Sequence, residues 1–295
     1  MRMRSSNPVL KGVVSTGQGR TGAQYAPGPY AQGPYAQPYQ QGAAGYGYQQ
    51  PGSPTTPTGP AASAEPMTID DVVMRTGMTL GMVILTAIAS FFLFDPANPG
   101  LGYALTFGGM IGGLILGLII AFTRSTNPVL IMLYAAFEGL FVGGISRVFE
   151  LSLPNTPTGS LVTQAVFGTI FAFATMLALY RFRIVRVTNT FVKVVMGALL
   201  GALVLILANF VVGFFIPGGL GLREPSALGV LVSLVMVVLA CAVLAIEFND
   251  IESGIKQGIP QRFAWQCAFG LTLTLVWLYI EILRLVWMLQ AIFSE

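Results

Sequence analysis

The sequence predicts an all-α polytopic membrane protein with seven transmembrane helices. Of its 295 residues, 54% are hydrophobic and 9% are charged, and the mean hydropathy is +0.73. A soluble domain usually has about 25% charged residues. The apolar residues run from near Val72 to Phe293 in blocks of roughly 20, each long enough to cross a hydrocarbon core of about 30 Å. A transmembrane β-barrel would instead show alternating strands of about 10 residues.

Windowed hydropathy gives the bounds of the predicted spans. They lie at about 73–94, 101–123, 128–149, 162–182, 191–216, 226–248 and 268–293. Turn sequences rich in proline, glycine and asparagine separate them, as at 95–100, 153–159 and 217–219. Glycines recur at helical intervals inside the second and third spans, which predicts close helix packing there. Residues 67–295 are therefore expected to form one transmembrane domain.

The N-terminal region has a different composition. Residues 1–66 are rich in Gly, Pro, Gln and Tyr and contain the near-repeat Gly-Pro-Tyr-Ala-Gln at 28–32 and 33–37. Such a segment has no apolar periodicity and cannot bury a core, so we expect a disordered cytoplasmic tail. It is not a signal peptide, because no apolar stretch follows its basic start. The tyrosines could serve as an interaction segment, or the tail could be a solvated extension.

The distribution of lysine and arginine predicts the orientation. The N-terminal region, the start of the first span and the second, fourth and sixth connections hold Arg2, Arg4, Lys11, Arg20, Arg75, Arg124, Arg181, Arg183, Arg186, Lys193, Lys256 and Arg262. The alternate connections hold only Arg147 and Arg223. We therefore expect a cytoplasmic N-terminus, an external C-terminus and an odd number of spans.

Three carboxylates are the best indication of function. Glu138, Glu247 and Glu281 lie in or against long apolar stretches, where an ionised side chain is expensive and usually faces a cavity, an ion path or a proton relay. Arg284 follows Glu281 by three residues and therefore shares its helical face. Asp250 lies about one turn beyond Glu247, which ends the sixth predicted span.

These carboxylates suggest a proton-sensitive site. If Glu247 and Glu281 met between the last two spans, they could share one proton, and their titration would belong to the pair. Once both carboxylates are ionised, they could repel each other or bind Ca²⁺, which prefers oxygen ligands. The chain has no histidine, so a proton switch would have to use carboxylates.

Three simpler interpretations stay open for the same residues. Glu281 and Arg284 could form a plain intrahelical ion pair. Glu247 and Asp250 could lie at the membrane interface, just outside the lipid. Glu138 could hydrogen-bond to a neighbouring helix.

Several other functions are disfavoured. Gly-x-Gly-Asp, Gly-x-Ser-x-Gly and P-loop motifs are absent from the sequence, so we expect no enzymatic activity and no cofactor. The two cysteines, Cys241 and Cys267, lie in apolar surroundings and suggest neither a disulfide framework nor a metal cluster. The net charge of +3 is accounted for by the cytoplasmic loops, so no nucleic-acid site is expected.

Three segments together resemble the Bax inhibitor family of transmembrane proteins, in its bacterial branch. They are Phe-Glu-Gly-Leu-Phe-Val-Gly-Gly-Ile at 137–145, Ile-Glu-Phe-Asn-Asp-Ile-Glu at 246–252 and Leu-Tyr-Ile-Glu-Ile-Leu at 278–283. The likeness covers about residues 67–295 and excludes the tail. It implies a bundle around a central seventh helix and a pH-sensitive calcium leak controlled by two aspartates on the last two spans. Glu281 and Glu247 match those positions, with Asp250 as the alternative to Glu247.

Together with this resemblance, the carboxylates lead us to expect a pH-responsive cation leak channel of the bacterial inner membrane, for Ca²⁺, gated by a buried carboxylate pair. Its partners would be the lipid bilayer, Ca²⁺ and protons. The alternative is a non-transporting membrane regulator or scaffold that binds a membrane protease or another membrane protein through its tail and loops.

Overall fold

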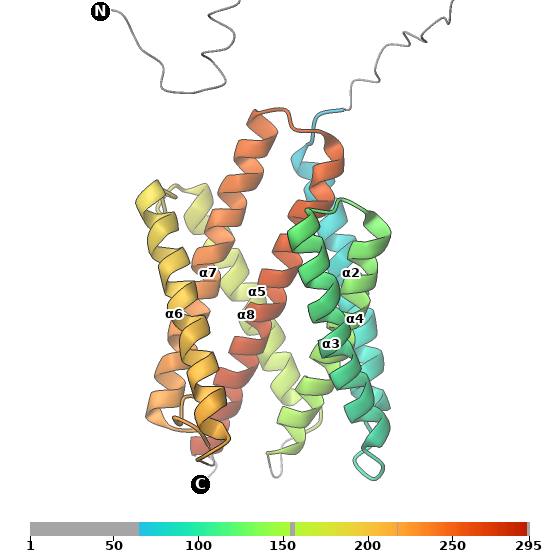
Figure 1. Ribbon diagram of the computed structural model, residues 1–295, viewed down its shortest axis with the longest axis vertical. Coiled ribbons are helices and arrows are strands. Elements are labelled where there is room, and N and C mark those ends of the chain that lie inside the picture. The colour runs from blue at the N-terminus through green and yellow to red at the C-terminus, as the bar shows by residue number, and fades with distance from the viewer. Residues whose placement is uncertain (1–64, 154–156, 217, 294–295) are drawn as a thin grey trace, which may run out of the picture. The chain divides into compact units, whose positions relative to one another are not determined.

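The computed structural model describes residues 65–153, 157–216 and 218–293, all within one unit of the chain. The predicted disordered tail lies outside these residues, except for its last two positions. The described part contains seven long helices, each long and apolar enough to cross a membrane. They are α2 (Ile69–Leu93), α3 (Gly100–Thr123), α4 (Pro128–Leu151), α5 (Ser160–Arg181), α6 (Asn189–Gly213), α7 (Ala227–Lys256) and α8 (Ala264–Phe293), with the short 3-10 helix η1 (Gln261–Phe263) before α8 (Figure 1). The predicted all-α, seven-span fold is confirmed.

Polar side chains and special backbone conformations define the helix ends. Thr68 begins α2 with a capping box, in which its hydroxyl accepts from the Asp71 amide and the Asp71 carboxylate accepts from Thr68. Asn127 caps α4, followed by a proline at the first helical position. After α7, Gly258 has φ +65°, a left-handed conformation that glycine adopts without strain and that turns the chain toward α8.

The main departure from the predicted bounds is at the end of α7. The helix continues to Lys256, whereas hydropathy predicted an end at residue 248. Residues 249–256 are too polar for a hydropathy window to detect, but they are still helical. An ion pair at i and i+4, Glu252 to Lys256 at 2.5 Å, supports this last part of the helix. Glu247 is therefore inside a helix and not at its end, which corrects the prediction.

The last helix is the centre of the bundle. Helix α8 packs against α2, α4, α5 and α7, and 67% of its most apolar stretch is buried inside the protein. By contrast, only 6% of the corresponding stretch of α6 is buried, and α6 packs mainly against α7. A central seventh helix was implied by the family resemblance and is confirmed.

Glycines allow α2, α3 and α4 to pack closely, as predicted. A Cβ at Gly143 of α4 would overlap the backbone oxygen of Ala87 in α2. A Cβ at Gly109 of α3 would lie 2.6 Å from the backbone nitrogen of Phe141 in α4. Backbones that approach this closely gain van der Waals contact, which is the main source of helix association in lipid.

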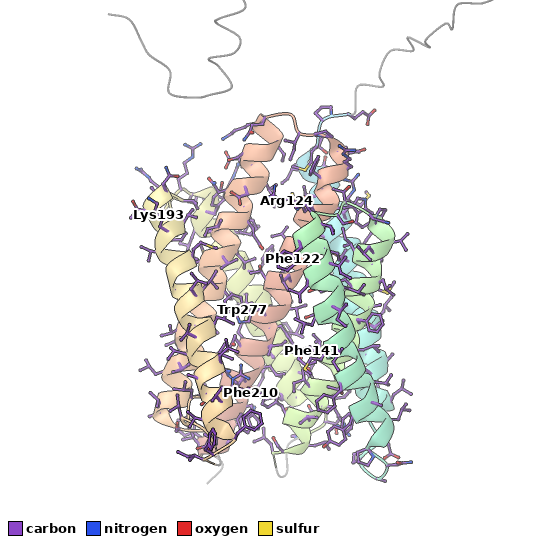
Figure 2. The ribbon with its side chains drawn as sticks, viewed as in Figure 1. Phe122, Arg124, Phe141, Lys193, Phe210 and Trp277 are labelled. Atoms are coloured by element: carbon purple, nitrogen blue, oxygen red, sulfur yellow. The ribbon has the colours of Figure 1, made fainter. Side chains whose placement is uncertain are left out.

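Basic residues gather at the end of the bundle that carries the α7–α8 loop. Arg124 and Lys193 lie at that end, and Phe210 lies at the opposite end (Figure 2). The first and last described residues also lie at opposite ends (Figure 1). This agrees with an odd number of spans. Which end faces the cytoplasm stays a prediction.

Candidate functional site

Glu247 lies in the interface between α7 and α8. Its Oε1 accepts a hydrogen bond from the Thr274 hydroxyl at 2.6 Å and faces Gly270, where a Cβ would lie 3.3 Å away. The other oxygen, Oε2, is buried and has no hydrogen-bond partner among the described residues. No described Lys or Arg forms an ion pair with Glu247. The carboxylate is therefore held at one oxygen and free at the other.

Glu281 lies deeper along α8 and is paired with a cation. Arg284 Nη2 donates to its Oε2 at 2.5 Å, and both side chains are buried. Trp277 Nε1 donates to Oε1 at 3.4 Å. The Ser233 hydroxyl of α7 donates to the Glu281 backbone oxygen at 3.2 Å, which fixes the neighbouring helix at this level. Of the alternatives that the sequence left open, this geometry matches the intrahelical ion pair.

The structure does not bring Glu247 and Glu281 together. Thr274, the partner of Glu247, lies seven residues before Glu281 on α8, which corresponds to about 10 Å along the helix axis. Two carboxylates that share a proton must lie within hydrogen-bond distance, about 3 Å. In this conformation the two carboxylates therefore cannot share a proton. They also do not form the expected Ca²⁺ site. The described residues also contain no cluster of three or more acidic, cysteine or histidine side chains suited to a metal.

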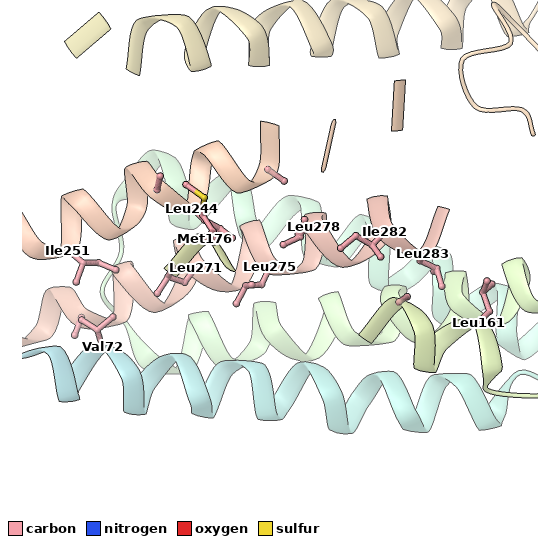
Figure 3. Close-up of a cluster of buried hydrophobic side chains, with 14 of the residues drawn as sticks. Val72, Leu161, Met176, Leu244, Ile251, Leu271, Leu275, Leu278, Ile282 and Leu283 are labelled. Atoms are coloured by element: carbon pink, nitrogen blue, oxygen red, sulfur yellow. The ribbon is translucent and has the colours of Figure 1, made fainter. Parts of the chain in front are cut away.

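Apolar side chains of α7 and α8 are buried at the levels between the two acids. Leu244 of α7 and Leu275 and Leu278 of α8 belong to one buried cluster at this level (Figure 3). Leu244 and Leu278 are fully buried. A hydrated cation that moved from Glu247 to Glu281 would meet these packed leucines, whose side chains offer no polar atoms to replace its water.

Asp250 is exposed, one turn beyond Glu247 toward the α7–α8 loop. Glu252 is also near this end, where it accepts from the Tyr180 hydroxyl of α5 at 2.5 Å and pairs with Lys256. Acidic side chains therefore extend from the end of α7 inward to Glu247.

Glu138 lies between α3 and α4, away from the α7–α8 interface. Its Oε2 faces Gly113 of α3, where a Cβ would lie 2.8 Å away. Tyr134 lies one turn earlier on α4, and its buried hydroxyl has no hydrogen-bond partner among the described residues. Tyr134 stacks edge-to-face on Phe269 of α8 at 4.9 Å between ring centroids. Because α4 and α8 run in parallel, Glu138 lies near the level of Thr274 and hence of Glu247. The two acids therefore lie at similar depth, Glu138 between α3 and α4 and Glu247 between α7 and α8.

Other polar groups were not identified from the sequence. Glu150 is buried at the end of α4, where it accepts from the Gly159 amide at 2.5 Å and from Arg147 at 3.3 Å. The fully buried hydroxyls of Thr79 and Thr272 bond at 2.7 Å between α2 and α8. The i and i+3 spacing of Arg147 and Glu150 could have indicated that ion pair. Isolated threonines in apolar helices carry no such signal.

The fold and the site together define a class: a seven-helix membrane protein whose central last helix carries and contacts buried carboxylates. Within that class, the chain belongs to the Bax inhibitor 1 like family, whose family model matches residues 7–291. The match begins well before residue 67, so the expectation that the likeness excludes the N-terminal region is wrong. No curated protein and no solved structure matches the chain.

Proposed function

We propose that the chain is a pH-responsive cation leak of the bacterial inner membrane, with Ca²⁺ as its ion and Glu247 as its proton-sensitive group. The observation that carries this proposal is the Glu247 carboxylate, buried in the α7–α8 interface with one oxygen unpartnered. Membership of the Bax inhibitor family supports a role in ion leak.

Glu247 and Glu281 have different roles in this mechanism. Glu281 already has the Arg284 guanidinium as its partner inside the bundle. Glu247 has a neutral partner, Thr274, so gain or loss of one proton changes the net charge of the interface. An ionised Glu247 attracts a cation or draws water toward its free oxygen, since an unpaired charge in apolar surroundings is costly.

The leucines between the two acids form the barrier that must open. A change in charge at Glu247 alters the packing of α7 against α8 next to Leu244, and movement of that contact would join the level of Glu247 to that of Glu281. Asp250 lies on the approach from the α7–α8 loop, where its exposed carboxylate concentrates cations. Glu138 offers a second acid at a similar depth, between α3 and α4, and is a candidate for a second path.

The test is Ca²⁺ flux into liposomes that contain only the purified protein, measured across a range of pH. Glu247→Gln keeps the shape of the side chain but cannot ionise, so its flux should lose most of its pH dependence. Glu281→Gln should change the size of the flux and keep the pH profile.

The matched control is Glu252→Gln, the same change on the same helix, where Lys256 and Tyr180 keep the side chain out of the interface. It should retain the wild-type profile. If Glu247→Gln also retains that profile, Glu247 is not the proton-sensitive group.

A further inference from the structure

A pocket of about 380 Å³ lies where the start of α2 meets the start of α8. Its lining residues come from the first three turns of α2 and from η1 and the first turn of α8: Asp70, Asp71, Met74, Arg75, Met78, Gln261 and Trp265. This volume is within the range of small-molecule sites. None of these residues takes part in the proposed leak.

The pocket is at the level of the lipid headgroups. Helix α2 has 25 residues and is about 37 Å long, so a few residues at each end extend beyond a hydrocarbon core of about 30 Å. Asp70 and Asp71 are in the first turn, in the headgroup region. Met74 and Met78 point outward from the next two turns and are exposed. Trp265 lines the same pocket, and tryptophan is enriched at membrane–water interfaces. The pocket is thus polar toward water and apolar toward the bilayer.

Contacts within the protein hold its polar wall in place. Gln261 Nε2 donates to Asp71 Oδ1 at 2.6 Å, and Arg75 Nη1 donates to the Gln261 backbone oxygen. The Arg75 guanidinium lies over the Trp265 ring at 5.6 Å. Because these groups are already ordered, a ligand would find them preorganised.

Two charged groups remain available to a ligand. Arg75 forms an ion pair with Asp71, but its Nη2 is 3.7 Å from Asp71 Oδ1, too long for a hydrogen bond. The Arg75 side chain is 15% exposed, and the N–H donors of Nη2 can take a phosphate oxygen that reaches this exposed part. Asp70 is exposed at the pocket and has no ion pair among the described residues. The pocket holds two acids, Asp70 and Asp71, and one base, Arg75. It therefore disfavours a headgroup with a net negative charge and favours one that carries a positive group beside its phosphate.

We propose that this pocket binds a phospholipid whose headgroup carries both a phosphate and a primary ammonium, as in phosphatidylethanolamine. The phosphate binds Arg75, the ammonium binds Asp70, and an acyl chain packs along Met74 and Met78.

The test is retention of lipid by the full-length protein in detergent. The protein is equilibrated with equal amounts of phosphatidylethanolamine, phosphatidylcholine and phosphatidylglycerol of the same acyl chains, and the bound lipid is quantified by mass spectrometry. We expect phosphatidylethanolamine to be enriched about two- to fivefold over each of the others, the size that an exposed ion pair supports. Asp70→Asn should abolish this enrichment over phosphatidylcholine.

The matched control is Asp95→Asn, an exposed acid in the turn at the far end of α2, which should keep the enrichment. Soluble phosphoethanolamine should not displace the lipid, because it lacks an acyl chain. Equal retention of the three lipids, an enrichment that survives Asp70→Asn, or displacement by soluble phosphoethanolamine would each overturn the proposal.

Discussion

The buried ion pair of α8 gives the sharpest prediction for stability. Arg284 and Glu281 are 6% and 3% exposed, and their closest nitrogen and oxygen are 2.5 Å apart. Arg284 Nε is buried without a hydrogen-bond partner, so Glu281 is the one side chain in the described residues that neutralises this guanidinium. Removing either partner leaves a buried charge without compensation.

Arg284→Gln should therefore cost about 3–5 kcal/mol of unfolding free energy, the usual loss when one member of a buried pair is removed. This corresponds to a change in the unfolding equilibrium of roughly a hundredfold to several-thousandfold. Glu281→Gln should cost a similar amount. The double variant should recover much of the loss, since it leaves neither charge unpaired.

Unfolding by a denaturing detergent, followed in micelles of fixed composition, measures these free energies. Lys256→Gln is the matched control, because it breaks an ion pair of the same length whose side chains are 68% and 43% exposed. Such a pair contributes about 0–1 kcal/mol. If Arg284→Gln costs no more than Lys256→Gln, or if the double variant is as unstable as the sum of the singles, the two buried charges do not compensate each other.

Three further predictions follow from the packing and the charge distribution. Gly143→Ala should destabilise the bundle by about 1–3 kcal/mol through overlap with the Ala87 backbone, whereas Gly197→Ala, which meets open space on α6, should have little effect in the same unfolding assay. Thr272→Val removes the bond to Thr79 and should cost about 1 kcal/mol, and a change above 3 kcal/mol would mean that the hydroxyl has another role. Reporters fused after Glu295 and near Thr68 should report the outside and the cytoplasm respectively, and a signal from one side only would contradict seven spans.

The fold was predictable from the sequence, because a stretch of about 20 apolar residues has few alternatives to a membrane-spanning helix. The Glu281–Arg284 pair was also predictable, since residues three apart on one helix share a face. The contact between Glu247 and Thr274 was not. This contact depends on the register of α7 against α8, and that register is set by side-chain packing at Leu244, Leu275 and Leu278. For the same reason the sequence could not decide whether Glu247 and Glu281 meet, and in this conformation they are apart.

Hydropathy also could not predict where α7 ends or which residues contact Glu150. Hydropathy measures transfer to lipid and not helix formation, so it could not detect that α7 continues to Lys256. The Gly159 partner of Glu150 comes from the next helix, across a connection whose path the sequence does not specify.

Ca²⁺ flux by the purified wild-type protein tests the central claim most directly. Liposomes that contain only this protein and an internal Ca²⁺ dye should take up Ca²⁺ faster than protein-free liposomes, at a rate that changes with pH. The same rate as protein-free liposomes at every pH, with the protein shown to be folded, would contradict a cation leak and favour the non-transporting regulator.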